Sequence, residues 1–264
     1  MSSLSPAARK SVLAFAASDP TSGAGVQADL LTISALGCHP LCVLTAVTVQ
    51  DTRGVEAMLA LEPRWVADQA RRVLDDIPVA AFKLGVLGSA DNARAIAEVL
   101  GEHPEVPVVL DPVLASARGD ALVADDAISA LRECLLPLTT IATPNSIEAR
   151  RLAPSASTLP QCARRLLEAG CDYVLITGTH ESTPEVVNTL YDASGALRED
   201  RWPRLPGSYH GSGCTLASAI AATHARGLDI AAAVREAQKF TWQSLAAGFR
   251  PGRGQFIPDR LFRK

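Results

Sequence analysis

Aromatic residues and methionine are scarce in this sequence. Phe, Trp and Tyr make up 5% of the 264 residues and there are only two methionines, whereas hydrophobic residues make up 48%. The core must therefore consist mainly of aliphatic side chains, which is typical of helices packed on parallel strands rather than of a β-sandwich. No apolar stretch approaches the roughly 20 residues that a membrane-spanning helix needs. We predict an α/β protein with no membrane partner.

The sequence also lacks a strong excess of charge of one sign and closely spaced cysteine pairs. The formal net charge of −3 leaves no basic surface for nucleic acid, which we exclude as a partner. The six cysteines form no C-x-x-C pair and have no zinc-ligand spacing with the five histidines. We therefore expect most of them to be buried, reduced thiols of a cytoplasmic protein.

The usual phosphate-binding glycine motifs are absent, but another glycine-rich loop is present. The chain has no GxxxxGK[ST] sequence, and Gly211 and Gly213 lack the third glycine of a dinucleotide fingerprint. Mainly alanine, leucine and isoleucine follow, up to Gly227, so the pair predicts a tight loop that opens into a buried helix. The unpaired amides and the dipole of such a helix start suit a phosphate. A close helix–sheet contact would account for the same glycines.

Buried strands alternate with helices along most of the chain. We predict strands at residues 12–17, 43–49, 81–86, 106–110, 139–142 and 173–177, of which 43–49 is expected to be buried on both faces. We predict helices at residues 26–36, 63–75, 90–100, 125–135, 146–152, 159–169, 214–226 and 230–247. Residues 186–206 predict a hairpin added antiparallel at one edge of the sheet.

This alternation predicts one domain over residues 1–264, with a loose segment at residues 1–10. Its central sheet is expected to be mainly parallel and covered by helices on both faces. In such a sheet the ligand site lies at the carboxyl ends of the strands. Asp19 and Asp111 each follow a predicted strand, so both are expected at that edge.

Short motifs follow one another in a specific order along these elements. They are Ser18-Asp19-Pro20, Gly23-Ala24-Gly25, Gln27-Ala28-Asp29, Gln50-Asp51-Thr52-Arg53-Gly54, Lys83-Leu84-Gly85, Asp111-Pro112-Val113, Thr143-Pro144-Asn145 and His210-Gly211-Ser212-Gly213-Cys214. Together they resemble the hydroxymethylpyrimidine and phosphomethylpyrimidine kinases of thiamine biosynthesis, a family of the ribokinase-like superfamily. The resemblance covers nearly the whole chain.

The resemblance implies a reaction, a fold and a set of site residues. The reaction is the ATP-dependent phosphorylation of 4-amino-5-hydroxymethyl-2-methylpyrimidine and then of its monophosphate, with Mg²⁺. The fold is a three-layer α/β/α ribokinase-like domain that forms a homodimer. The residues that fall on the family's pyrimidine site are Ala17, Asp29, Gln50 and Val86. Those that fall on its anion hole are Gly211, Ser212 and Gly213, with Cys214 in the place of the catalytic aspartate of sugar kinases. Those that fall on its nucleotide site are Asp111, Asn145, Thr177 and His180, and the magnesium site receives Asp111 and Glu148.

Elementary chemistry agrees with several of these roles. Phosphoryl transfer needs positioning and charge neutralisation, which backbone amides and Mg²⁺ supply. A helix N-terminus lowers the pKa of a thiol, so Cys214 is expected to serve as a base. Asp29 and Gln50 suit a purely structural role as well, as a helix N-terminal acid and a turn amide. Asn145 and Glu148 also suit a helix cap and its capping-box partner, a role compatible with catalysis.

The sequence departs from the family pattern at a few positions. Ala17 and Ser22 stand where glycines are common, and Thr177 stands where a lysine usually neutralises phosphate. Ala117-Arg118-Gly119 replaces a Lys-Ser-Gly run, and its arginine is expected to supply the positive charge. Two alternatives follow. One is a pyridoxal kinase of the same family, although residues 114–117 lack the second cysteine of that pattern, and the other is a pyrimidine-binding or regulatory protein without ATP turnover.

Overall fold

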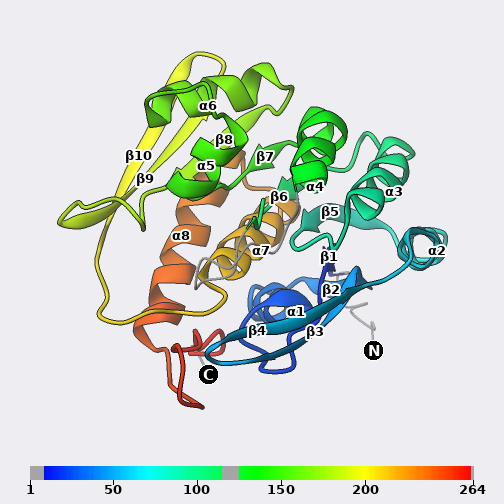
Figure 1. Cartoon of the computed structure of the whole chain (residues 1–264), viewed down its shortest axis with the longest axis horizontal. Coiled ribbons are helices and arrows are strands. Elements are labelled where there is room, and N and C mark those ends of the chain that lie inside the picture. Colours follow the sequence, from blue (N-terminus) through cyan, green and yellow to red (C-terminus); the bar gives the residue numbers. More distant parts are fainter. Residues whose placement is uncertain (1–8, 115–124, 263–264) are drawn as a thin grey trace, which may run out of the picture.

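The structure, a computed structural model, describes residues 9–114 and 125–262 (Figure 1). In this part of the chain the main sheet has the strand order β10-β9-β8-β7-β6-β5-β1-β2, and β3 and β4 form a separate two-stranded sheet. The strands are β1 (Ser11–Ala16), β2 (His39–Leu44), β3 (Ala46–Asp51), β4 (Gly54–Ala60), β5 (Val79–Leu84), β6 (Val108–Leu110), β7 (Ile141–Ala142), β8 (Tyr173–Thr177), β9 (Glu185–Asp192) and β10 (Gly195–Pro203). The helices are α1 (Gly25–Ala35), α2 (Pro63–Leu74), α3 (Ala90–Gly101), α4 (Asp125–Ala130), α5 (Ser146–Leu152), α6 (Leu159–Glu168), α7 (Ser212–Ala225) and α8 (Ile230–Ala246).

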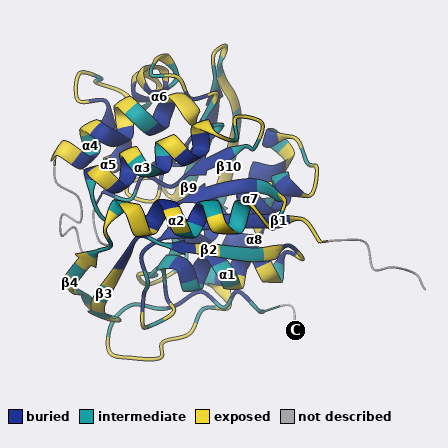
Figure 2. Ribbon diagram, turned by 90° about the vertical axis from the view of Figure 1, so that its right-hand side faces the viewer, coloured by how far each residue is buried: buried dark blue, intermediate teal, exposed yellow. Residues whose placement is uncertain are grey.

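Helices cover both faces of the main sheet, so the protein has three layers (Figure 1). Successive residues of a strand point to opposite faces. Leu13 and Phe15 of β1 accordingly pack in the cluster that includes residues of α2 to α6, whereas Val12 and Ala14 pack with α1, α7 and α8. Figure 2 shows the buried strands inside and the exposed residues on the outer sides of helices such as α2 and α6. The predicted α/β/α architecture is confirmed.

The strands from β2 across to β8 run parallel, and β9 and β10 continue the sheet antiparallel. The predicted hairpin at one edge is therefore confirmed. Because the parallel strands share one direction, the loops after β1, β5, β6, β7 and β8 all leave the same edge of the sheet. That edge positions the candidate site.

One predicted strand is wrong. Residues 43–49, expected as a single strand buried on both faces, are divided between β2 and β3, which belong to different sheets. The division falls at Thr45, whose backbone N–H donates to the carbonyl of Ala16 (3.1 Å) and whose hydroxyl donates to the carbonyl of Val86 (2.6 Å). Beyond it, β3 pairs with β4, which the sequence did not predict, and Val49 is 59% exposed. Runs of β-branched residues favour extended backbone but do not specify the pairing partner.

Most helices differ from their predicted bounds by one residue at one or both ends, and two differ more. Helix α7 begins at Ser212 rather than at Cys214, because Gly211 takes the left-handed cap conformation directly before it. The helix expected at residues 125–135 changes after α4 into a π-helical turn (Leu131–Leu135) and a 3₁₀ turn (Leu136–Leu138). Pro137 lacks the N–H that an α-helix would need there. By contrast, α5 and β8 have the predicted bounds.

Several further expectations can be compared with the structure. Of the loose segment at 1–10 only residues 9 and 10 are described, and Arg118 lies outside the described residues. Within the described ranges, no helix is long and apolar enough to cross a membrane. All six cysteines are free thiols, of which Cys42 is exposed, Cys134 is half-buried and the other four are buried, as expected for most of them.

Candidate active site

The glycine loop before α7 lies against the loop before α1. Gly211 has a φ of 80°, in the left-handed region, and a Cβ there would lie 1.9 Å from the carbonyl oxygen of Gly23. Only glycine fits such a position. Ser212 and Gly213 form the first turn of α7, whose amides have no partners inside the helix. The predicted tight loop is confirmed, and it presents the positive end of a helix dipole.

Asp111, directly after β6, faces this loop. A Cβ on Gly213 would lie 3.5 Å from Asp111 Oδ1. The carboxyl group is buried, and its Oδ2 has no hydrogen-bond partner among the described residues. Burial raises the pKa of Asp111 to about 6, against the lowering effect of Lys83. An unpaired, buried carboxylate oxygen is suited to a cation.

Glu148, in the first turn of α5, adds a second carboxyl group. Its Oε2 accepts the N–H of Asn145 (2.9 Å), and Asn145 Oδ1 accepts the N–H of Glu148 (3.0 Å), which completes a capping box. Burial, together with the nearby Asp111, raises the pKa of Glu148 to about 8. The capping interpretation of these two residues is therefore confirmed.

The donors around Asp111 fit magnesium in part. No group of three or more His, Cys, Asp or Glu side chains within the described ranges could hold a metal ion on its own. Mg²⁺ is usually bound through one or two carboxylates together with substrate phosphates. Asp111 has an oxygen without a partner among the described residues, and Glu148 lies close enough for Asp111 to raise its pKa, so the two residues fit that smaller contribution.

The structure corrects the expectation for Cys214. Its thiol is buried, and burial raises the pKa to about 12, although Lys83 lowers it. The helix N-terminus does not compensate for the loss of water, which favours the neutral thiol. The expected lowering of the pKa of Cys214 is therefore wrong, and its role as a base stays a prediction.

Asp29 on α1 is engaged in a buried ion pair. Its carboxylate accepts hydrogen bonds from Lys83 Nζ (2.8 Å to Oδ1 and 3.0 Å to Oδ2) and from the Ser218 hydroxyl (2.7 Å). The side chains of Asp29 and Lys83 are both 0% exposed. Burial lowers the pKa of Lys83, but the Asp29 carboxylate outweighs it and the net pKa is raised. The pair joins α1, β5 and α7, a role that the sequence motif did not indicate.

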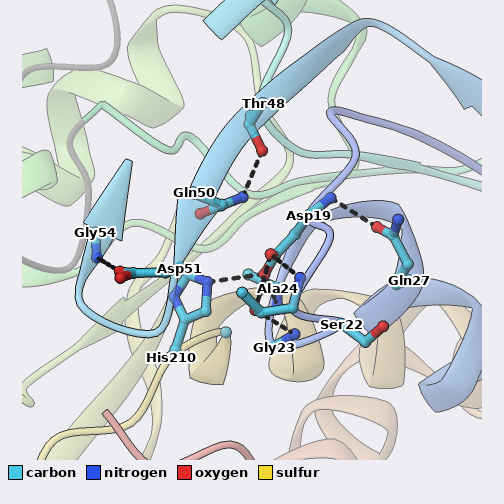
Figure 3. A network of polar contacts seen from close by, with 12 residues as sticks. Asp19, Ser22, Gly23, Ala24, Gln27, Thr48, Gln50, Asp51, Gly54 and His210 are labelled. Carbon is cyan, nitrogen blue, oxygen red and sulfur yellow. Dashed lines mark hydrogen bonds and ion pairs between the residues drawn. The ribbon is translucent and has the colours of Figure 1, made fainter. Parts of the chain in front are cut away.

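Gln50, near the end of β3, lies in a hollow of about 390 Å³. Its Nε2 donates to the hydroxyl of Thr48 (2.7 Å; Figure 3). That hydroxyl in turn donates to the carbonyl of Ser18 (2.8 Å), so the amide is held in one orientation. The hollow is lined by Pro20, Thr21, Gln50, Asp51, Thr52, Arg53, Gly252 and Arg253. Ala17 and Val86 do not line it.

Asp19 connects this hollow with the glycine loop. Its Oδ2 lies 2.9 Å from His210 Nε2 and accepts the N–H of Ala24 (2.7 Å), and its Oδ1 accepts the N–H of Thr21 (2.8 Å) (Figure 3). Burial raises the pKa of Asp19, but His210 and the backbone donors outweigh it, so the pKa is lowered. The carboxylate charge therefore fixes the loop before α1 against the loop before α7.

The expected nucleotide residues lie farther along the same edge. Thr177 ends β8 and forms a parallel bridge with Asn145, so the structure brings these two together. His180 is exposed in the following turn. That turn is held by Arg204, which donates to the carbonyls of Thr179 (2.9 Å) and Thr183 (2.7 Å).

Comparison with known proteins agrees with this arrangement. Residues 19–259 match the family model described as phosphomethylpyrimidine kinase. The chain belongs to this family. A hydroxymethylpyrimidine/phosphomethylpyrimidine kinase of Streptomyces coelicolor is 42% identical to this kinase over 251 residues, which cover 92% of this chain and 91% of the relative. The protein of the same name from Escherichia coli is 38% identical over 243 residues, which cover 90% and 91%.

Solved structures confirm the ribokinase-like fold of this kinase. A phosphomethylpyrimidine kinase from Clostridium difficile has a TM-score of 0.79 at 32% identity, covering 90% of this chain and 100% of the other. The pyridoxal kinase of Bacillus subtilis, solved as an ADP complex, has a TM-score of 0.89 at 27% identity, covering 97% and 99%. ADP in such a neighbour agrees with ATP as the phosphoryl donor of a kinase.

Sequence reasoning missed several residues around the site of this kinase. Lys83 was noticed only as part of a motif, and its buried position has no signal in the sequence. Gly252 and Arg253, which line the hollow, and Arg260, which lies behind the glycine loops, come from a Pro/Gly-rich C-terminal segment without helical or strand periodicity. Such a segment gives no indication of what it packs against.

Proposed function

We propose that this kinase phosphorylates the hydroxymethyl group of 4-amino-5-hydroxymethyl-2-methylpyrimidine with ATP, and then phosphorylates the monophosphate, in thiamine biosynthesis. The observation that carries the proposal is that, in a member of this family, Gly213 faces the buried carboxylate of Asp111, whose Oδ2 has no hydrogen-bond partner among the described residues. An anion-binding loop opposite a candidate cation ligand is the arrangement that phosphoryl transfer needs.

The glycine loop is the part of the chain that acts on the transferred group. The hydroxymethyl oxygen bonds to the γ-phosphorus and loses its proton to water, the bond to the β–γ bridging oxygen breaks, and ADP leaves with that electron pair. The amides at the start of α7 hold the phosphoryl oxygens, and the helix dipole offsets their charge. Such a loose transition state needs little help from a base, which agrees with the raised pKa of Cys214.

Asp111 and Glu148 are the residues that would hold Mg²⁺. When bound there, the ion would neutralise phosphate charge. Asp111 would contribute the oxygen that has no partner within the described residues, and Glu148 would lose its proton as a cation approaches, because a cation favours the ionised carboxylate.

Gln50 is the residue that we assign to the choice of pyrimidine. An amide offers both a donor and an acceptor, so it can pair with an amino group and a ring nitrogen of one pyrimidine. Its fixed orientation through Thr48 supports this role. Because Asp29 is enclosed with Lys83, we propose that it acts on the pyrimidine only by supporting α7, through Ser218.

We also propose that the kinase is a cytoplasmic homodimer, chiefly from the family resemblance. A symmetric dimer is the commonest soluble oligomer. Light scattering at micromolar concentration should give the mass of two chains, and a single-chain mass would contradict this part of the proposal.

A coupled assay of ADP release tests the function. The pyrimidine alcohol, its monophosphate and pyridoxal are compared as acceptors, with and without Mg²⁺. We expect Mg²⁺-dependent turnover with the first two. Preference for pyridoxal would support the rival enzyme, which the likeness to the Bacillus subtilis structure favours. No ADP release with any acceptor would support a pyrimidine-binding protein without turnover.

A further inference from the structure

A buried arginine from the C-terminal segment lies behind both glycine loops. Arg260 is 3% exposed and follows directly on residues 19–259, which the family model matches. Its Nε donates to the hydroxyl of Thr215 (3.0 Å). Its guanidinium also donates to the carbonyls of Ser22 (3.3 Å), Gly23 (2.5 Å) and Gly211 (3.5 Å). One side chain thus contacts the loop before α1 and the loop before α7.

The charge of Arg260 is unusual for its position. All four acceptors are neutral oxygens, so none of these hydrogen bonds pairs the guanidinium with an anion; it stays protonated in proteins, and the carboxylates of Asp19 and Asp29 act on it only through space. Burial lowers its pKa, because desolvation disfavours the charged form, and this outweighs the opposing effect of the Asp29 and Asp19 carboxylates. A cation is also unfavourable beside the N-terminus of a helix, where the dipole is already positive. An anion bound at the glycine loop would relieve both costs, so the arrangement suits a phosphate.

The segment that carries Arg260 is itself fixed to the site. The N–H of His210 donates to the carbonyl of Phe256 (2.8 Å), and the N–H of Gln255 donates to the carbonyl of Thr52 (2.8 Å). The N–H of Gly254 donates to the hydroxyl of Thr52 (2.9 Å). The C-terminal segment therefore spans from the hollow around Gln50 to the glycine loop, and Arg260 follows where it passes behind them.

We propose that Arg260 is a positioning residue for phosphoryl transfer. It holds residues 22–25 against residues 210–213, so that the amides at the start of α7 converge on the phosphoryl group, and it adds positive potential behind them. This role rests on the proposed kinase function, because the group that it would help to hold is the transferred phosphoryl.

The test compares two arginines that join the same pair of helices at opposite ends. Arg226, at the far end of α7, is exposed and donates to the carbonyl of Leu36 after α1 (3.3 Å). We expect Arg260→Met to lower kcat at least about tenfold while KM for the pyrimidine changes less than about threefold, because loosened amides weaken the transition state most. Arg226→Met should keep the wild-type kcat. Arg260→Lys should recover part of kcat, since it keeps the charge but lacks the guanidinium fork.

Hydrogen exchange gives a readout that needs no substrate. Peptides that cover residues 20–28 and 208–216 should exchange faster in Arg260→Met than in the wild type or in Arg226→Met. Absence of turnover in the wild type would overturn the proposed function. The exchange comparison would then decide the role of Arg260 by itself. Unchanged exchange in Arg260→Met would overturn the positioning role.

The remaining outcomes also decide the proposal. A folded Arg260→Met variant with wild-type kcat overturns it, whatever its exchange rates, and so does an equal loss of kcat in Arg226→Met. If Arg260→Met does not fold, Arg260→Lys decides: a lowered kcat with unchanged KM supports positioning. Wild-type kcat in Arg260→Lys, or failure of both variants to fold, would assign Arg260 to fold stability alone.

Discussion

Gln50 is the side chain whose removal should separate pyrimidine recognition from ATP binding. Gln50→Ala leaves the polar groups of the pyrimidine without partners, at a cost of about 1–3 kcal/mol each, which corresponds to a KM increase of roughly five- to 150-fold. KM for ATP should change little, because Gln50 lies in the hollow and not beside Asn145 or Thr177. Steady-state kinetics with each substrate varied checks this. Gln161→Ala, at the exposed start of α6, is the control, and equal losses for both substrates in Gln50→Ala would make Gln50 structural.

Glu148 should make the stability of the metal-free protein depend on pH. Its pKa is raised from 4.5 to about 8 by burial, so the folded protein binds this proton more tightly than the unfolded chain. Its contribution to stability is complete below pH 4.5 and is lost as the pH rises towards 8, by up to about 1.4 kcal/mol per pH unit. Glu148→Gln stays neutral and can keep the capping box with Asn145. Urea unfolding at pH 5 and 7.5, with a chelator present, should show the variant gaining stability relative to the wild type, and parallel behaviour would contradict the prediction.

The motifs predicted where individual site residues lie along the elements better than they predicted the burial and the partners of those residues. The sequence placed Asp111 and Asn145 at strand ends, where they are found, because local patterning determines where strands end. It did not predict that Asp29 pairs with Lys83, or that burial raises the pKa of Cys214. Burial and ion pairing depend on contacts between segments far apart in the chain, and a pKa follows from those contacts rather than from the residue type.

At the scale of elements, the backbone at the start of α7 should contribute more to turnover than the thiol of Cys214. Gly213 has no left-handed φ, and a Cβ there meets Asp111 only at ordinary contact distance, so Gly213→Val should fold. Its branched side chain would occupy the space between the amides and Asp111, and we expect turnover to be abolished. Cys214→Ser should keep measurable activity, because each preorganised donor is worth roughly 10²–10³ in rate whereas the transition state needs little base. ADP release with circular dichroism as the fold control checks both, and full activity of Gly213→Val would refute phosphate binding at this loop.

Local sequence patterns were sufficient to predict some strands but not others. The strands at the sheet centre and the edge hairpin were predicted because each has its own buried or alternating pattern. The division of residues 43–49 was not, since the turn at Thr45 depends on hydrogen bonds to Ala16 and Val86. Where the partner of a strand lies far away in sequence, the local pattern shows extended backbone and nothing about the sheet it joins.

At the scale of the whole molecule, the Lys83–Asp29 pair joins the main sheet to the helices that follow the two glycine loops, α1 and α7. Lys83 comes from the main sheet, Asp29 from α1, and Ser218 of α7 completes the group. Each of these buried charges depends on the other, because a buried ion without its partner has neither water nor a counter-ion to stabilise it. The network therefore makes correct docking of α1 and α7 on the sheet a condition for placing the glycine loops.

Removing one charge should therefore cost far more than removing both. Lys83→Met leaves the Asp29 carboxylate buried without its cation, and we expect a loss of about 3–5 kcal/mol in the free energy of unfolding. The double variant Lys83→Met/Asp29→Leu removes both ions at similar volume, and most of that loss should be recovered, since apolar replacements of buried pairs are often neutral or stabilising. Urea unfolding of the wild type, the two single variants and the double variant measures the coupling. Additive losses in the double variant would show that the two side chains stabilise the protein independently, and that the ion pair is not what joins α1 and α7 to the sheet.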